Sequence, residues 1–220
     1  RARAWVLEDD YDSEFRYAGR PLASLQGRDR AGRVCYVRTF SKVLFPALRL
    51  AYLVAPPAIV PALRDRLLRQ GARASLVAQV PLARFIASGL FAQHIRRMRR
   101  LYAERQRGLL RAIDMHLKGL LIAEPAEAGM HLVARFTPAL LKRMDDIEAS
   151  ERAAQAGVVA KPLSGYSALA TPAPGLVIGF AAFDEPTIDD AAGRLAEALN
   201  PSSGAGTRGR PSRAGRRHTR

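Results

Sequence analysis

The sequence predicts an α/β fold, with a mixed, mostly parallel sheet and helices, followed by a smaller α+β unit. Two observations predict this fold. Over residues 1–89, short apolar runs bounded by turn residues alternate with longer stretches of helical periodicity. After Gly119, short alternating runs return and are interspersed with two further helical stretches. Apolar residues make up 48% of the 220 residues, which is enough for a packed core rather than a disordered chain.

The first part of the chain is expected to contain three strands: Ala4–Leu7, Val34–Val37 and Leu50–Val54. The first is short and apolar, so we expect it to be buried, and we expect the first two to lie side by side in parallel. Pro56 and Pro57 end the third strand. Helices are expected over residues 58–70 and 76–88, where they would cover the sheet.

The clearest helix is expected over residues 90–117. Its apolar side chains recur at steps of three and four residues and include Phe91, Ile95, Met98, Leu101, Tyr102, Leu109 and Ile113. Arginines lie largely between these positions, so the pattern predicts an amphipathic helix with a solvated basic face.

Residues 119–200 are expected to form a small α+β domain. The expected strands are Leu120–Ala123, His131–Phe136, Val158–Ala160 and Leu176–Ala182. The expected helices are Asp145–Ala156 and Pro186–Leu199. Residues 201–220 are rich in Ser, Gly and Arg and have no apolar periodicity, which predicts a disordered basic tail.

The net charge of +15 invites a nucleic-acid interpretation, but the distribution of charge weakens it. The last twenty residues hold six arginines and no acid, and most of the other positive charges are spread along the chain. One cysteine excludes an internal disulfide and fits a reducing cytoplasm. No apolar run reaches the ~18 residues of a membrane span, and no signal peptide opens the chain. We therefore expect a cytoplasmic protein without a membrane segment.

The most informative stretch is residues 39–50, which reads TFSKVLFPALRL. It places a lysine, Lys42, among apolar neighbours, with Arg49 seven residues further on. The chain has only four lysines against 31 arginines, so a lysine at position 42 is not explained by the general excess of positive charge. Apolar surroundings would disfavour the ammonium form and lower the pKa of Lys42. A neutral amine attacks an aldehyde to form a Schiff base, which an arginine does not.

A cluster of acids follows the first expected strand. If that strand and Val34–Val37 are parallel neighbours, Asp9 and Lys42 lie at the same edge of one sheet, where α/β folds place their ligands. A carboxylate, a phenol such as Tyr11 and an amine at one edge suit pyridoxal phosphate. The carboxylate keeps the ring nitrogen protonated, the phenol bonds the ring oxygen, and the amine carries the aldehyde.

At this point the chain resembles a known family. DDYDSEFRY at residues 9–17, GRPL at 19–22, SLQG at 24–27 and the stretch 39–50 are similar to the effector domain of MocR-type, GabR-like regulators of the GntR superfamily. The resemblance extends from about residue 4 to residue 199. It implies a type I aminotransferase fold: residues 1–89 as the carboxyl-terminal part of a large domain, 90–118 as an interdomain helix and 119–200 as the small domain.

The resemblance also implies roles for five residues. Lys42 matches the Schiff-base lysine, Asp9 the partner of the pyridinium nitrogen and Tyr11 the partner of the phenolic oxygen. Arg49 matches the arginine that binds the cofactor phosphate, and Thr39 stands where a hydroxyl joins it. The implied cofactor is pyridoxal 5'-phosphate. The implied partners are an amine or amino-acid effector, a second copy of the chain in a homodimer, and DNA only through an N-terminal winged helix-turn-helix that this chain lacks.

Neighbouring candidates have simpler explanations. We expect Asp10, Asp12 and Glu14 to be solvated or structural acids. Cys35 and His131 lie in apolar strand patterns, so a buried thiol and a core histidine are expected. Four histidines and one cysteine are scattered without the spacing of metal ligands, so no metal site is expected.

One departure from the family limits the functional interpretation. Aminotransferases hold the substrate carboxylate with an arginine in the last strand of the small domain, but residues 175–180 read GLVIGF. Arg38 and Arg135 are possible replacements. A true aminotransferase, which moves an amino group between an amino acid and an oxo acid, therefore stays open as an alternative to a regulator. So does an inactive fragment, because the N-terminal half of an aminotransferase domain is expected before residue 4.

Overall fold

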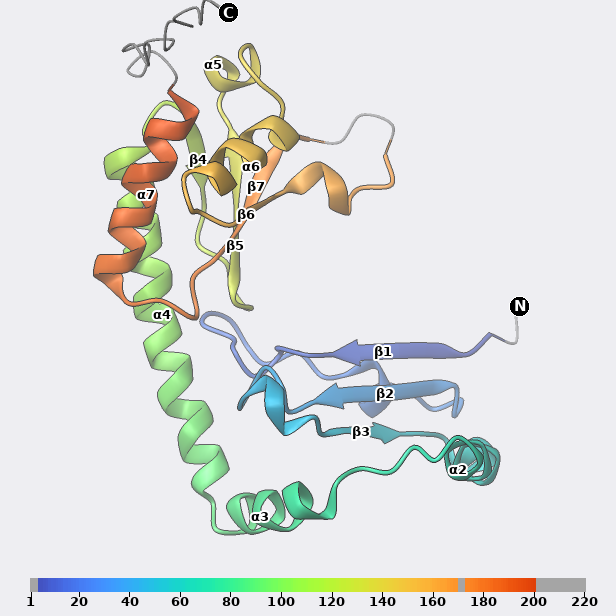
Figure 1. The fold of residues 1–220 in the computed structure, drawn as a ribbon. Helices are drawn as coiled ribbons and strands as arrows, with labels where there is room; N and C mark the ends of the chain where they lie inside the picture. The colour runs from blue at the N-terminus through green and yellow to red at the C-terminus, as the bar shows by residue number, and fades with distance from the viewer. Residues whose placement is uncertain (1–3, 170–172, 201–220) are drawn as a thin grey trace, which may run out of the picture.

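The computed structural model describes residues 4–169 and 173–200, and the expected disordered tail lies outside these ranges. The described chain contains two separate sheets, one of three and one of four strands. Figure 1 shows that the long helix α4 (Leu90–His116) runs beside both sheets and carries the chain from the first to the second. This arrangement agrees with the mixed α/β and α+β architecture that the sequence predicts.

The first sheet has the order β1-β2-β3. Its strands are β1 (Val6–Asp10), β2 (Val34–Thr39) and β3 (Ala51–Val54). β1 and β2 are parallel, with Val6 opposite Val34 and Asp10 opposite Arg38. β3 is antiparallel to β2, so the sheet is mixed. The predicted parallel neighbours are confirmed, and β1 begins and ends later than expected.

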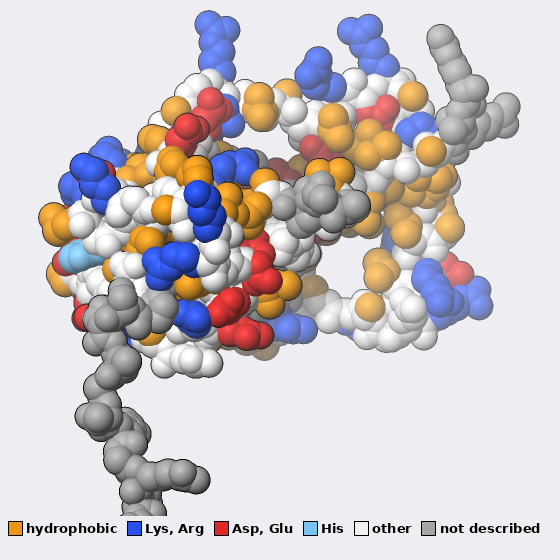
Figure 2. All heavy atoms as spheres, turned by 90° about the horizontal axis from the view of Figure 1, so that it is seen from above, with side chains coloured by type: hydrophobic (Ala, Val, Ile, Leu, Met, Phe, Trp, Pro, Cys, Tyr) orange, Lys and Arg blue, Asp and Glu red, His pale blue; other side chains and the backbone are white. Residues whose placement is uncertain are grey.

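The expectation that the first strand is buried is wrong for this chain. Leu7 is 70% exposed and Trp5 is 46% exposed, because β1 is the edge strand and no described helix covers its faces. Cys35, on the central strand β2, is half-buried rather than a core thiol. Figure 2 shows apolar side chains on the surface of this part of the molecule, interspersed with Lys and Arg.

The helices of the first part were expected to cover the first sheet, and the structure differs from this expectation. They are α1 (Leu25–Arg28), α2 (Val60–Arg69) and α3 (Leu76–Ala87), with 3-10 turns at Pro46–Leu48 and Pro57–Ile59. α2 has no buried residue and lies beyond β3, away from α4 (Figure 1). α3 packs against α4 through Phe85 and Phe91, whose ring centroids are 6.2 Å apart. Neither α2 nor α3 therefore covers the sheet as predicted.

The second sheet has the order β4-β5-β7-β6, and all its neighbouring pairs are antiparallel. Its strands are β4 (Leu121–Ala123), β5 (His131–Phe136), β6 (Ala160–Pro162) and β7 (Gly175–Gly179). The helices of this part are α5 (Pro138–Leu141), α6 (Asp146–Gln155) and α7 (Glu185–Leu199), with a 3-10 turn, η3, at Leu163–Tyr166. The expected strand at residues 158–160 is found two residues later, as β6.

One face of this second sheet forms the main core. Alternate residues such as Leu132, Ala134 and Ile178 are buried against α4, α6 and α7, as the two-residue period of a strand requires. A second, smaller core cluster holds Phe15 and Val43 of the first part together with Ile95 of α4 and Met130. This cluster ties the loops of the first sheet to the start of β5.

Within the described ranges, no single helix has the length and apolar character needed to cross a membrane. α3 and α4 pass that test only as a pair, and they are bent by 81° at their junction.

Candidate functional site

The site predicted from the sequence lies at the carboxyl ends of β1 and β2. Because these strands are parallel, both end at the same edge of the sheet, with Asp9 opposite Val37 and Thr39 closing β2. Lys42 follows in the turn after β2. Figure 1 shows this edge facing α4, beneath the start of β5. The predicted placement of Asp9 and Lys42 at one sheet edge is confirmed.

The turn that follows β1 is held by a network around Asp10. The Asp10 carboxylate accepts hydrogen bonds from the hydroxyls of Ser13 and Tyr36, each at 2.7 Å. Arg38 donates to the Tyr36 hydroxyl at 2.9 Å and forms an ion pair with Glu14. Burial raises the pKa of Asp10, but these hydrogen bonds and the Arg38 charge outweigh it, so the net pKa is lowered. Asp10 and Glu14 are structural acids, as predicted.

Lys42 is presented to solvent rather than buried. Its neighbour Val43 is 3% exposed and enters the small core cluster, while the Val43 carbonyl lies 2.9 Å from Nε2 of His94 on α4. The apolar residues around Lys42 therefore anchor the turn instead of enclosing the amine. The expectation of an amine in apolar surroundings is wrong in this chain.

Arg49 has an unusual backbone conformation. Its φ of 52° is the only positive φ of a non-glycine residue in the described ranges, and its side chain is exposed. This left-handed residue ends the 3-10 turn that leads into β3. Thr39 lies opposite Ala51 across the β2–β3 pair, and its hydroxyl accepts a hydrogen bond of 3.1 Å from the Ser41 backbone. The two residues therefore flank the turn that carries Lys42.

The available side chains fit the chemistry of pyridoxal phosphate. Among the residues that the structure describes, the side chains of Asp9, Tyr11, Lys42 and Arg49 make no hydrogen bond or ion pair, whereas their neighbours Asp10, Glu14 and Arg38 are paired. An unpaired acid, phenol, amine and guanidinium match the ring nitrogen, ring oxygen, aldehyde and phosphate of the cofactor. These are the residues that could hold it.

The second sheet supplies another wall of the site, which the sequence did not predict. A Cβ at Gly129 would lie 3.2 Å from Oδ2 of Asp12, so the start of β5 adjoins the turn after β1. Burial and the charge of Asp10 raise the pKa of Asp12, against the opposing effect of nearby His131 and Lys42. Burial and the charge of Lys42 lower the pKa of His131, against the effect of Asp12.

His131 is therefore not the core histidine that was expected. It lies on the exposed face of β5 with Val133 and Arg135, while the residues between them are buried. The alternation of polar and apolar residues in the sequence contained this signal, and a strict two-residue period would have placed His131 on the open face. Tyr166 of η3 also adjoins the site, since its phenol is among the groups that raise the pKa of Tyr11, after Asp12, burial and Asp9.

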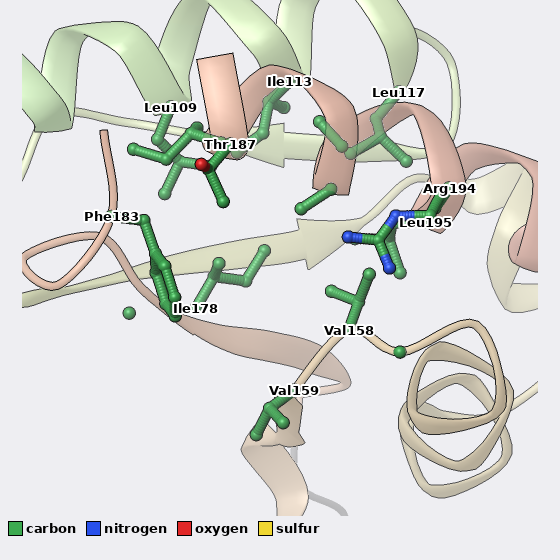
Figure 3. A pocket seen from close by; sticks show the side chains of 15 residues that line it. Leu109, Ile113, Leu117, Val158, Val159, Ile178, Phe183, Thr187, Arg194 and Leu195 are labelled. Carbon is green, nitrogen blue, oxygen red and sulfur yellow. The ribbon is translucent and has the colours of Figure 1, made fainter. Parts of the chain in front are cut away.

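A separate apolar pocket of about 170 Å³ lies between α4, α7 and the end of β7. Figure 3 shows side chains such as Leu109, Ile178 and Phe183 around it. None of the five predicted site residues lines this pocket. Its one charged side chain, Arg194, donates hydrogen bonds to the Asp190 carboxylate at 3.0 Å and to the Ala156 carbonyl at 2.8 Å. The pocket offers neither an acid nor an amine, so it lacks the groups that were predicted for the site at the sheet edge.

Comparisons with known proteins show which proteins the chain resembles. The chain is 44% identical over 200 residues to a probable rhizopine catabolism regulatory protein, MocR, from Rhizobium meliloti. It is 37% identical over 185 residues to an uncharacterized HTH-type transcriptional regulator, YhdI, from Bacillus subtilis. The matches cover 90% and 84% of the chain but only 40% and 39% of the two regulators. No family model matches the sequence.

Solved structures show the same fold. A kynurenine aminotransferase from Pyrococcus horikoshii, solved with PMP, superimposes with a TM-score of 0.76 at 28% identity, over 89% of this chain and 47% of that one. LysN, an α-aminoadipate aminotransferase from Thermus thermophilus, gives a TM-score of 0.76 at 26% identity, over 89% and 50% of the two chains. The chain therefore belongs to the MocR-type regulators of the GntR superfamily and corresponds to the part of them that has the aminotransferase fold.

Proposed function

We propose that this chain is the pyridoxal-phosphate-binding, effector-sensing part of a MocR-type transcription regulator. The observation that carries the proposal is the set of unpaired side chains Asp9, Tyr11, Lys42 and Arg49, which lie at the end of β1 and in the loops at and beside the same sheet edge. The chain spans about two-fifths of the curated regulators it matches, so the activity and partners of the whole protein are part of the proposal.

Each residue has a defined task in this proposal. Bound pyridoxal phosphate supplies an aldehyde that captures amines. Lys42 offers the amine that holds the cofactor, and Asp9 keeps a proton on the ring nitrogen. Tyr11 donates to the ring oxygen, while Arg49, with the Thr39 hydroxyl, binds the phosphate through its planar guanidinium.

The effector is proposed to be an amine or amino acid that competes with Lys42 for the cofactor. Binding of such an effector would leave the Lys42 amine free, where its charge acts on Asp12 and His131. We propose residues 1–89, 90–118 and 119–200 as the units that this change moves relative to one another. DNA contact would come from a helix-turn-helix outside these 220 residues, in a cytoplasmic homodimer.

The test uses the complete gene product with added pyridoxal phosphate. We expect the visible absorbance of lysine-bound cofactor, and we expect borohydride reduction followed by mass spectrometry to locate the cofactor on Lys42. Lys42→Ala should abolish both signals. Lys118→Ala, a change of an exposed lysine before β4, should leave both intact. A wild-type protein without lysine-bound cofactor would remove the proposal.

A true aminotransferase is the second candidate, because the superimposed structures include aminotransferases solved with PMP and with N-(5'-phosphopyridoxyl)-L-leucine. In that case Lys42 would also move a proton between substrate and cofactor. Amino-group transfer from an amino acid to an oxo acid, measured as released oxo acid over many turnovers, would favour the enzyme. A single stoichiometric binding event without turnover would favour the regulator. If the 220-residue chain binds no cofactor while the complete gene product does, the chain by itself is an inactive fragment.

A further inference from the structure

The apolar pocket between α4, α7 and the end of β7 is separate from the site at the sheet edge. Leu109 of α4, Ile178 of β7 and Leu195 of α7 form its walls, and each is at most 8% exposed. Phe183 and Val159 also line it and are 53% and 80% exposed, so the pocket meets solvent beside these two side chains (Figure 3). It is therefore a hollow with buried walls that a molecule can enter from outside.

Small residues keep this volume open. Ala191 and Ala192 line it from α7, and Gly179 lines it from β7. Gly157 lines it after the end of α6, and a Cβ at this position would be only 2.9 Å from Nη1 of Arg194. Protein interiors contain few voids larger than a water molecule, and unfilled apolar volume lowers stability. An apolar ligand that fills this pocket of about 170 Å³ therefore gains favourable packing.

The lining also determines the charge of the ligand. Among the described residues that form the pocket, only Thr187 and Arg194 have polar side chains. Arg194 already donates to the Asp190 carboxylate and to the Ala156 carbonyl, so its charge is compensated. A charged ligand would lose its hydration in this pocket without gaining an unengaged partner of opposite charge. An uncharged apolar molecule carries no such cost.

We propose that this pocket binds a small uncharged apolar molecule of about the size of one aromatic ring. The volume determines the size of the ligand, because an apolar cavity of about 150 Å³ in another protein stays dry and accepts benzene. This second ligand site goes beyond the proposed function, since none of the residues assigned to the cofactor lines it. A ligand without an amino group does not react with an aldehyde, so the two proposals are tested independently.

The experiment uses the complete gene product and toluene, an uncharged single ring. Calorimetry measures the affinity, and NMR of labelled methyl groups places the ring through its contacts with Ile178 and Leu109. We expect contacts with both side chains and a dissociation constant of about 0.1–1 mM, which is reasonable for so small a ligand. Benzoate carries the same ring with a charge, and it should bind in this pocket at least about tenfold more weakly.

Two variants make the same change on the same helix. Ala191 lines the pocket and is half-buried, so Ala191→Leu fills the volume and should weaken toluene binding by at least about tenfold. Ala198 is also half-buried but does not line the pocket, and Ala198→Leu should stay within about twofold of wild type. Phe183→Ala removes an exposed ring at the mouth of the pocket and should weaken binding by about threefold or more.

Three results would overturn the inference: a complete gene product that does not bind toluene, a bound ring that contacts neither Ile178 nor Leu109, or a folded Ala191→Leu variant that binds toluene as wild type does. The first would show that the pocket is already filled in the complete protein. If Ala191→Leu does not unfold cooperatively, Phe183→Ala decides, and an unchanged affinity in that variant overturns the inference. Benzoate bound in the pocket as tightly as toluene would overturn the ligand class.

Discussion

At the scale of single residues, the two acids that end β1 differ in whether they form hydrogen bonds. Asp10 is engaged by Ser13 and Tyr36, while Asp9, one position earlier, points to the other side of the strand and is unpaired in the described chain. Successive strand residues face opposite sides, so adjacent acids in the sequence meet different surroundings. Asp10 therefore holds the turn that positions Asp9 and Tyr11.

The lowered pKa of Asp10 predicts a pH dependence of stability. The ordinary value is 3.8, and the folded-state pKa lies below it, so the unfolded chain binds the proton first as the pH falls. The stabilisation is therefore complete above the ordinary pKa and is lost as the pH falls through the folded-state pKa. We expect Asp10→Asn to cost about 1–2 kcal/mol in the free energy of unfolding at neutral pH.

Urea denaturation at a series of pH values down to about pH 3 measures this effect. The difference between wild type and Asp10→Asn should shrink as the pH falls. Asp114→Asn, a change of an exposed acid on α4, serves as the control and should track wild type at every pH. A constant gap between wild type and Asp10→Asn would contradict the assignment of the pH dependence to Asp10.

At the scale of elements, α4 carries the structural connection between the two sheets. Its amino-terminal half contributes Ile95 to the cluster with Phe15 and Val43, and its carboxyl-terminal half contributes Leu109 and Ile113 to the main core. The helix is amphipathic along its whole length, and this one apolar stripe serves both cores. Because this stripe is continuous, the helical period of its apolar residues could be recognised in the sequence.

The buried stripe of α4 predicts unequal costs of substitution. Leu109 is 5% exposed where α4 packs on α7, so Leu109→Ala should lower the free energy of unfolding by about 2–5 kcal/mol. Met115, on the same helix, is 72% exposed, and Met115→Ala should stay within about 0.5 kcal/mol of wild type. Chemical denaturation of both variants tests this, and equal costs would show that α7 does not pack on α4 in solution.

At the scale of the whole molecule, the two halves differ in how well they bury their apolar residues. The part built on the second sheet has a continuous core, whereas β1 and α3 of the first part leave large apolar side chains in contact with solvent. Leu7 is 70% exposed and Val77 is 85% exposed. Apolar surface of this extent on an edge strand favours association with other chains.

We therefore expect residues 1–220 alone to self-associate as their concentration rises. Replacing Leu7 and Val77 together by Ser should reduce this association, because it removes apolar surface without touching a buried residue. Val159→Ser, at a site that is 80% exposed in the second part, is the matched control and should leave the association unchanged. Light scattering coupled to size-exclusion chromatography measures the mass, and a strict monomer at all concentrations would refute this expectation.

The sequence by itself determined the local elements and the sheet edge at which Asp9 and Lys42 meet. Apolar periodicity and the order of the strands follow from short-range pattern, so β2, α4 and α7 were found close to their true bounds. Strand ends and turns also placed Asp9, Tyr11 and Lys42, whereas Thr39 and the role of Arg49 came from the resemblance to the MocR-type family. Their roles toward a cofactor stay a prediction.

Only the tertiary structure decided which residues face the site from the second sheet and which surfaces stay uncovered. His131 is far from Lys42 in the chain, and the packing of the second sheet against α4 brings it close enough for the Lys42 charge to act on it. The exposure of β1 likewise depends on which elements cover it, and not on its own apolar character. Burial and long-range proximity are properties of the packed molecule, and a local pattern of residues does not contain them.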